Sequence, residues 1–361
     1  MDRTSATNSE DGLYTDLDVS TGVAGTAIRA ADKNAIQEEL MNVIENADLT
    51  PDSDNWTQLL QGIRREIRKA VIPINDTWKN IYTFDSSIEV ALCGGVDTFF
   101  VGPHDKNIYQ STDNGESWKT VATLDSYATA MAYANDIILV GTYSGSIWRS
   151  SDNGDSWEKV YSDFSKRIYK FAYTEDGWIV GGNLSGILYK STDDGESWDT
   201  VLDLEDDDAY FPIVIYGGGI AIAGSSNGII YKSADNGDSW SKIQQLSSYR
   251  FYDGYYHNGV FVVSMSDATI WRSTDDGESW DNTLSADNKI KTLSQGNGTA
   301  FAGETSTYAL YKSTDDGESW EKVATLDGSI SAQAYSNGVF LLIAGGKLVY
   351  RPFLPDNLKD I

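Results

Sequence analysis

The sequence predicts a mainly β protein, a seven-bladed β-propeller preceded by an N-terminal helical hairpin. Three observations predict this fold. A motif of the form S-x-D-x-G-x-S-W recurs six times along the 361 residues. Its closing tryptophans are 39 to 42 residues apart, which is typical of a propeller blade. A further tryptophan, Trp78, lies 40 residues before Trp118 without a motif in front of it.

Each repeat predicts four short strands. In residues 164–203 apolar runs occur at 168–173, 178–181, 187–190 and 198–202. Clusters of Gly, Asn, Asp and Ser separate these runs, and such residues form tight turns. The motif itself occupies the turn between the third and fourth strands.

The residue types of the motif suit a tight turn. Asp193 can accept hydrogen bonds from turn amides, Gly195 can adopt a conformation that other residues resist, and Trp198 can cover the hairpin and the neighbouring blade. This pattern resembles the Asp-box, or BNR, repeat of sialidases and related β-propellers, over about residues 85–352. The resemblance implies a structural turn that lies away from any active site. The aspartates and tryptophans concerned are Asp113, Trp118, Asp152, Trp157, Asp193, Trp198, Asp235, Trp240, Asp275, Trp280, Asp315 and Trp320.

The two ends of the repeat region complement each other. Residues 327–352 supply three strands with no motif after them, and the segment at Trp78 supplies a fourth strand with no motif before it. We expect these segments to form the seventh blade, because such pairing removes two exposed strand edges. The alternative is a six-bladed ring with stray strands.

The predicted organisation has four parts. They are an extended N-terminal arm (1–27), a helical anchoring segment (28–75), the propeller (76–353) and a C-terminal tail (354–361). Within the anchoring segment, apolar residues recur at helical spacing on either side of Thr50-Pro51. Two interpretations stay open: an intramolecular helical hairpin, or a seam that builds a homo-oligomer such as a trimer or docks on a larger assembly.

The anchoring segment carries a second resemblance. Asn34-Ala35-Ile36-Gln37-Glu38-Glu39-Leu40 and Asp48-Leu49-Thr50-Pro51-Asp52 are similar to the N-terminal region of many bacteriophage tail-fibre proteins. This resemblance implies a virion or phage-like tail location, after synthesis in the host cytoplasm. It also implies attachment of residues 1–75 to other tail or baseplate proteins, with the following domain facing the host. Shaft repeats are missing from the sequence, so a short fibre or baseplate appendage is favoured.

Composition excludes several classes of partner and site. Acidic residues outnumber basic ones 54 to 27, which argues against binding to nucleic acid. Cys93 is the single cysteine and histidine occurs twice, so neither an intramolecular disulfide nor a multi-histidine metal site can form. No apolar run is long enough to span a membrane, the polar start lacks a signal peptide, and we expect no cofactor. The acidic run 205–208 is either a solvated loop or a lip that binds a cation or a sugar.

The sequence predicts binding rather than catalysis. A sialidase needs three converging arginines. Arg167 and Arg250 lie where the chain enters inner strands, but a third arginine of that kind is missing. Arg149 and Arg272 stand just before the motif, where other repeats have lysine, and are therefore interpreted as scaffold. A glycosidase that uses two carboxylates stays open.

Candidate contact residues are those that do not repeat from blade to blade. Strand alternation places them at the end of the blades opposite the motifs, where aromatic and hydrogen-bonding groups suit a glycan or protein surface. We expect a receptor-binding tail component; the alternatives are a glycan-cleaving enzyme and a purely architectural part. The predicted binding residues are Tyr127, Tyr143, Phe164, Arg167, Tyr210, Phe211, Tyr249, Arg250 and Tyr308, with His104 and Lys166 beside them.

Overall fold

The computed structural model describes residues 78–352 except 89–91, 96–97, 163, 165, 183–185, 205–208 and 337, and eight residues nearer the N-terminus. The chain divides into two compact units, Asn75–Phe353 and a second unit made of Met1–Ile74 with Leu354–Ile361. In the second unit, strands β1 (Leu13–Tyr14) and β4 (Ile28–Arg29) pair antiparallel, as do β2 (Leu17–Asp18) and β3 (Val23–Ala24). The predicted helices lie outside the described residues.

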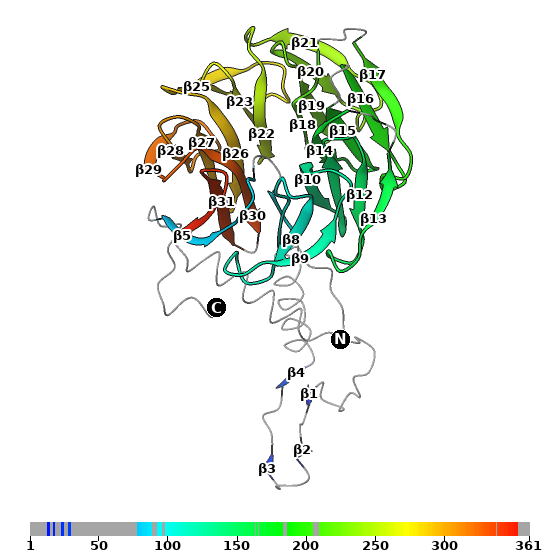
Figure 1. Cartoon of the computed structure of the whole chain (residues 1–361), viewed down its shortest axis with the longest axis vertical. Coiled ribbons are helices and arrows are strands. Elements are labelled where there is room, and N and C mark those ends of the chain that lie inside the picture. The colour runs from blue at the N-terminus through cyan, green and yellow to red at the C-terminus, as the bar shows by residue number, and fades with distance from the viewer. Residues whose placement is uncertain are drawn as a thin grey trace. The chain divides into compact units, whose positions relative to one another are not determined.

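The larger unit consists of seven four-stranded antiparallel sheets arranged around one axis (Figure 1). Blade 1 contains β6 (Leu92–Gly94), β7 (Phe99–Val101), β8 (Asn107–Ser111) and β9 (Lys119–Thr123). Blade 2 contains β10 (Ala128–Ala134), β11 (Ile137–Thr142), β12 (Ile147–Ser150) and β13 (Glu158–Tyr161). Blade 3 contains β14 (Ile168–Tyr173), β15 (Trp178–Gly182), β16 (Ile187–Ser191) and β17 (Asp199–Asp203).

The remaining blades repeat this order. Blade 4 contains β18 (Ile213–Gly217), β19 (Ile220–Gly224), β20 (Ile229–Ser233) and β21 (Ser241–Gln245). Blade 5 contains β22 (Phe251–His257), β23 (Val260–Met265), β24 (Thr269–Ser273) and β25 (Asp281–Ser285). Blade 6 contains β26 (Ile290–Gly296), β27 (Thr299–Glu304), β28 (Ala309–Ser313) and β29 (Glu321–Thr325). Blade 7 contains β30 (Ile330–Ser336), β31 (Val339–Ala344), β32 (Leu348–Pro352) and β5 (Trp78–Thr83).

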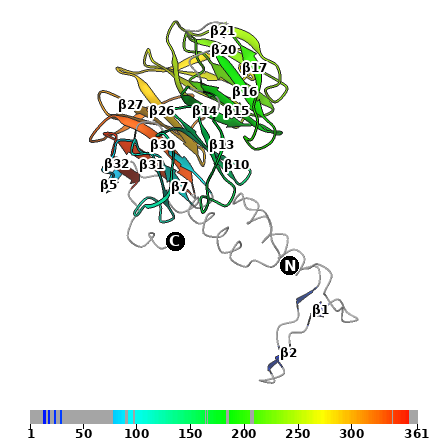
Figure 2. The same ribbon diagram turned by 45° about the vertical axis from the view of Figure 1, so that its right-hand side comes forward.

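Blade 7 joins the two ends of the propeller. Strand β5 pairs with β32 in antiparallel register, with Thr83 opposite Leu348 and Trp78 opposite Pro352. The two strands lie side by side in Figures 1 and 2, where the blue start of the propeller meets its red end. This pairing confirms the prediction of seven blades closed by the strand at Trp78, and the six-bladed alternative is wrong.

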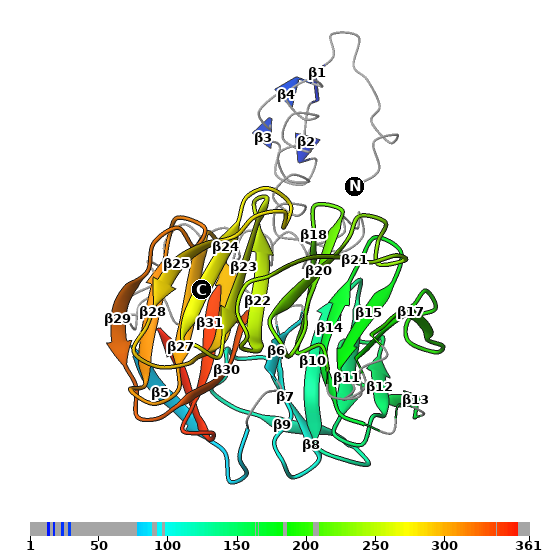
Figure 3. The same ribbon diagram turned by 90° about the horizontal axis from the view of Figure 1, so that it is seen from above.

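The core lies between neighbouring blades. The first strand of each blade contacts the first strand of the next, so β6, β10, β14, β18, β22, β26 and β30 surround the axis. Second strands such as β11, β23 and β31 are buried along their whole length, because blades cover both of their faces. Figure 3 shows outer strands such as β13, β17 and β29 at the periphery. The residues of these strands are exposed or half-buried.

Strand direction gives the propeller two distinct faces. We call one the motif face, because the six motif turns between third and fourth strands lie there. The opposite loop face carries the connections between blades and the loops between second and third strands. Because β5 begins and β32 ends at the pair Trp78–Pro352, the chain enters and leaves the propeller at the motif face.

The motif turn has the hydrogen bonds expected of it. Asp193 Oδ1 accepts from the Ser191 hydroxyl and from the Ser197 amide, each at 2.8 Å, and Oδ2 accepts from the Ser197 hydroxyl at 2.5 Å. Gly195 has φ +88°, and its carbonyl accepts from the Trp198 indole at 3.0 Å. The side chain of Trp198 packs in a cluster that joins blades 2 and 3. Each turn therefore fixes both its own hairpin and the neighbouring blade.

Residues just before the motifs link each blade to the next. Lys190 of blade 3 forms an ion pair with Asp238 in the motif of blade 4, at 2.6 Å. Arg149 pairs with Glu196 of the following blade at 3.0 Å, and Arg272 donates to the following motif's carbonyl at Asp316. These contacts confirm the scaffold interpretation of Arg149 and Arg272.

Candidate functional site

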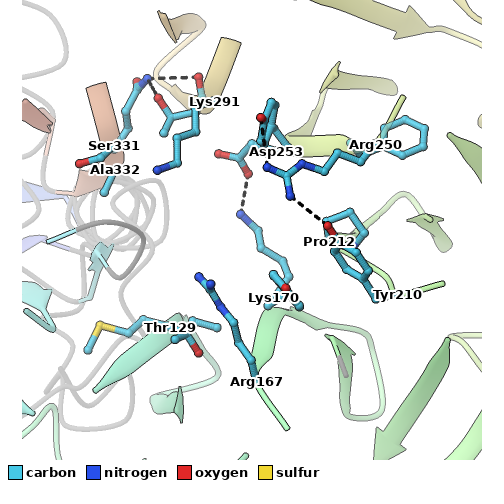
Figure 4. A pocket seen from close by; sticks show the side chains of 17 residues that line it. Thr129, Arg167, Lys170, Tyr210, Pro212, Arg250, Asp253, Lys291, Ser331 and Ala332 are labelled. Atoms are coloured by element: carbon cyan, nitrogen blue, oxygen red, sulfur yellow. Dashed lines mark hydrogen bonds and ion pairs between the residues drawn. The ribbon is translucent and has the colours of Figure 1, made fainter. Parts of the chain in front are cut away.

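A cavity of about 300 Å³ opens at the propeller axis on the loop face (Figure 4). We call it the axial pocket. Residues at or just before the start of six inner strands line it, from β10, β14, β18, β22, β26 and β30. Its wall therefore contains side chains from Thr129 to Gln333, which are far apart in the sequence.

The axial pocket is positively charged in an acidic protein. Arg167, Lys170, Arg250 and Lys291 line it, against one carboxylate, Asp253. The whole chain has a formal charge of −27. Figure 4 shows the ends of these cations directed toward the same space. A concave site lined by one sign of charge concentrates field lines and attracts the opposite charge. The lining therefore favours an anionic group.

Arg250 is held by two tyrosines. Its guanidinium donates to the phenol oxygen of Tyr210 at 3.0 Å and to that of Tyr252 at 3.1 Å. The guanidinium carbon also lies over the ring of Tyr252, 4.7 Å from the ring centre. Burial opposes its charge, but the hydrogen bonds to Tyr252 and Tyr210 outweigh burial and raise the pKa of Arg250. Arg250 is therefore a fixed cation at the mouth of the pocket.

Arg167 forms a similar group in blade 3. Its guanidinium carbon lies 4.8 Å from the ring centre of Tyr169, and Tyr169 stacks on Tyr210 at 4.9 Å with 23° between the planes. Arg167 Nε is buried without a hydrogen-bond partner among the residues that the structure describes. An unsatisfied buried donor is unfavourable, so this Nε lowers the stability of the pocket wall.

Asp253 connects three blades beneath these cations. Its Oδ1 forms an ion pair with Lys170 at 2.6 Å, and its Oδ2 accepts from the Leu293 amide at 2.9 Å. Both oxygens of the carboxylate are therefore engaged, and Asp253 positions the wall of the pocket.

The structure brings three predicted site residues together and separates the others. Arg167, Tyr210 and Arg250 line the axial pocket. The side chains of Tyr143, Tyr249 and Tyr308 are 51%, 54% and 40% exposed, and all three belong to segments of the loop face. Tyr127 stacks between Tyr143 and His104, with ring centres 4.9 Å and 4.5 Å away. Lys166 is exposed just before β14.

Two predicted contact residues belong to the core instead. Phe164 is 6% exposed and packs on Tyr161 and Tyr189, and Phe211 is fully buried and packs on Tyr231. The expectation that they contact a partner is wrong. Their loops need apolar anchors between blades, and this requirement cannot be distinguished from surface recognition by residue type alone.

Sequence reasoning missed Tyr169, Lys170, Tyr252, Asp253 and Lys291. A signal exists in two parallel strings, Arg167-Ile168-Tyr169-Lys170 and Arg250-Phe251-Tyr252-Asp253, where arginine and tyrosine are two residues apart. In both blades the strand register shifts just here, between Ile168 and Lys170 and between Phe251 and Asp253. A β-bulge redirects side chains, so two consecutive residues reach the pocket. Strict alternation could not have predicted this arrangement.

The described residues give two further findings on ligands and membranes. They contain no group of three or more His, Cys, Asp or Glu side chains placed to hold a metal ion. The acidic run 205–208 lies outside them. Within the same part of the chain, no helix combines the length and the apolar character that crossing a bilayer requires.

Comparisons with known proteins agree on the fold. The family model described as sortilin, neurotensin receptor 3, a propeller family, matches residues 106–213. No curated protein matches the sequence. Among solved structures, "YCF48 bound to D1 peptide" is similar with a TM-score of 0.62 at 14% identity, covering 77% of this chain and 95% of that chain. YCF48 from Cyanidioschyzon merolae has a TM-score of 0.61 at 13% identity, covering 78% and 99%. The WD40 propeller of Doa1 has a TM-score of 0.64 at 12% identity, covering 78% and 98%. At these identities the likeness establishes a β-propeller and nothing finer.

Proposed function

We propose that this chain is a receptor-binding component of a bacteriophage tail or a phage-like contractile particle. Residues 1–75 attach it to other tail or baseplate proteins, and the propeller binds a glycan or protein on the host surface. The axial pocket carries the proposal, because it is cationic and lies on the loop face. The chain enters and leaves the propeller at the opposite face, which supports anchoring from one side and recognition on the other.

The repeated motif is, in this proposal, an Asp-box that serves as a structural turn. The hydrogen bonds of Asp193 recur at Asp113, Asp152, Asp235, Asp275 and Asp315, which supports one conserved local geometry. All six turns lie on the motif face, away from the axial pocket. This separation supports a scaffold role for the turns and a binding role for the loop face.

The pocket's chemistry supports binding over glycan cleavage. Hydrolysis by paired carboxylates needs two acids on either side of the scissile bond. The lining of the axial pocket contains one carboxylate, Asp253, and both of its oxygens are engaged. This lining therefore disfavours a glycan-cleaving enzyme, and release of sugars from purified host polysaccharide would contradict that conclusion.

Particles that carry the variants Tyr210→Ala and Tyr249→Ala test the proposal. We expect lost adsorption to host cells with intact particle assembly, because both residues lie on the loop face and neither belongs to the β5–β32 pairing that closes the ring. Several copies on one particle strengthen weak contacts, so adsorption of whole particles is the sensitive measurement.

The matched control is Lys242→Ala, an exposed residue on the outer strand β21. It should leave adsorption unchanged. Normal adsorption of both tyrosine variants would contradict the recognition role and favour a purely architectural one.

A further inference from the structure

Aromatic side chains extend the axial pocket across the loop face on both sides. Toward blade 2, the Tyr143 amide donates to the carbonyl of Tyr127 at 3.0 Å, two residues before Thr129 of the pocket lining. Tyr143 stacks on Tyr127 with 24° between the ring planes, which holds it in place. Toward blade 5, Tyr249 directly precedes Arg250. The pocket is therefore flanked by two tyrosines, Tyr143 and Tyr249.

These flanking tyrosines are unusually exposed. Among the residues that the structure describes, three large apolar side chains are exposed, and Tyr143 and Tyr249 are the two most exposed of them. Aromatic rings combine a large apolar area with a hydrogen-bonding tip, which suits recognition of a ligand with both kinds of surface. Exposure on both sides of a charged pocket indicates a ligand longer than the pocket itself.

The pocket offers hydrogen-bond donors in excess. Tyr210 and Tyr252 each accept from Arg250 through the phenol oxygen, which leaves each phenol hydrogen to donate elsewhere. Arg167 adds a second guanidinium to the lining. A ligand that satisfies these donors must be rich in acceptors, and the surrounding cations require it to be negative.

We propose that the loop face binds an acidic polysaccharide, with a sugar carboxylate in the axial pocket and neighbouring sugars over Tyr143 and Tyr249. This inference rests on the proposed recognition function and names the ligand class of the same site. Sugar rings present flat C–H surfaces with hydroxyls at the edge, which match exposed tyrosines. An acidic peptide would satisfy the charge of the pocket, but it does not present such flat C–H faces to the exposed rings of Tyr143 and Tyr249.

The first experiment compares defined ligands on the full chain by calorimetry. The probes are oligogalacturonate and hyaluronan fragments of two to eight sugars, the methyl ester of oligogalacturonate, and oligoglutamate. We expect binding by at least one carboxylated sugar, affinity that increases with length, and a loss of tenfold or more in the methyl ester. Equal binding of the ester, oligoglutamate as the tightest ligand, or no binding by any acidic sugar would overturn the inference.

The second experiment uses variants of the full chain with short and long acidic sugars. Arg250→Ala should weaken both by roughly tenfold or more, because a charge-assisted hydrogen bond is lost. Tyr143→Ala should weaken only the long sugar, by about threefold to tenfold, because the short one stays within the pocket. Lys119→Ala, an exposed cation on β9, is the charge-matched control and should bind normally. A uniform effect of Arg250→Ala and Lys119→Ala would indicate general charge attraction and overturn the inference.

Adsorption to whole host cells separates this inference from the proposed function. A chain that adsorbs to cells but binds no acidic sugar keeps its recognition role and loses the ligand assignment. In the opposite outcome, the chain binds acidic sugars, but replacing Arg250 leaves the adsorption of particles unchanged. The ligand site is then kept and the receptor role is lost.

Discussion

At the scale of single residues, position within a strand decides which predicted side chains face a ligand. Arg167 and Arg250 stand at the same place before inner strands of blades 3 and 5, and each lies over a tyrosine two residues later. Phe164 and Phe211 lie four and two residues before their inner strands, in the preceding loops, and fill the space between blades. Charged residues must keep their ends near water, whereas phenylalanine gains free energy by burial. Arginine was therefore the more reliable indicator of the site.

Asp253 gives a prediction at this scale. Asp253→Ala removes the partner of Lys170 and of the Leu293 amide, so we expect the free energy of unfolding to fall by roughly 1 to 3 kcal/mol. A protein of this size should then unfold about 2 to 5 °C lower, measured by calorimetry. Asp253→Asn keeps an acceptor for the amide and should lose less. Equal unfolding temperatures for the wild type and the alanine variant would contradict the cross-linking role.

At the scale of elements, the motif turn combines a local and a tertiary function. Its serine and aspartate satisfy the turn, and the cation before it reaches the motif of the next blade. Arg351 of blade 7 continues this series by pairing with Glu116 of blade 1, although blade 7 itself carries no motif. The sequence predicted the turn chemistry from one repeat, because its contacts lie within eight residues. The contacts between blades required the ring.

The motif aspartates predict acid sensitivity. Hydrogen bonds from the hydroxyls of Ser239 and Ser233 lower the pKa of Asp235 to about 2, and the other five motif aspartates also have lowered pKa values. The pKa of an aspartate in the unfolded chain is about 3.9, so the stabilisation is present above about pH 4. It is lost as the pH falls toward 2. Denaturant unfolding should show a steep loss of stability across this window.

Asp235→Asn tests the same turn. We expect it to lower the free energy of unfolding at pH 7 by about 1 to 2 kcal/mol and to reduce the loss between pH 4 and pH 2. The control is Asp199→Asn, an exposed residue on β17. An unchanged pH profile in Asp235→Asn would show that the turn does not cause the acid sensitivity.

At the scale of the whole molecule, closure converts a repeat into a ring with two unlike faces. Strand β5 contributes Ile81 and Tyr82 to the cluster between blades 7 and 1, and its pairing covers the edge of β32. Closure also fixes where the chain enters, because Trp78 and Pro352 lie together. The pocket at the axis exists because the ring brings the starts of six inner strands around one space.

Removal of β5 tests closure. A chain of residues 85–361 should unfold about 10 °C or more below a chain of residues 76–361, because a strand pairing and the large apolar side chains of Trp78, Ile81, Tyr82 and Phe84 are lost. It should also self-associate through the uncovered edge of β32, measured by light scattering. Matching unfolding temperatures and monomeric behaviour in both chains would contradict the role of β5 in the ring.

The sequence by itself determined the number of blades, the position of each motif turn and the partner of the strand at Trp78. Those features follow from periodicity and from contacts between residues that are close in sequence or related by the repeat. The tertiary structure alone decided that Arg167, Lys170, Arg250 and Lys291 share one pocket, and that Phe164 and Phe211 do not belong to it. The physical reason is that β-bulges and packing between blades set the direction of each side chain. The bulges recur from blade to blade, but the residues at them differ.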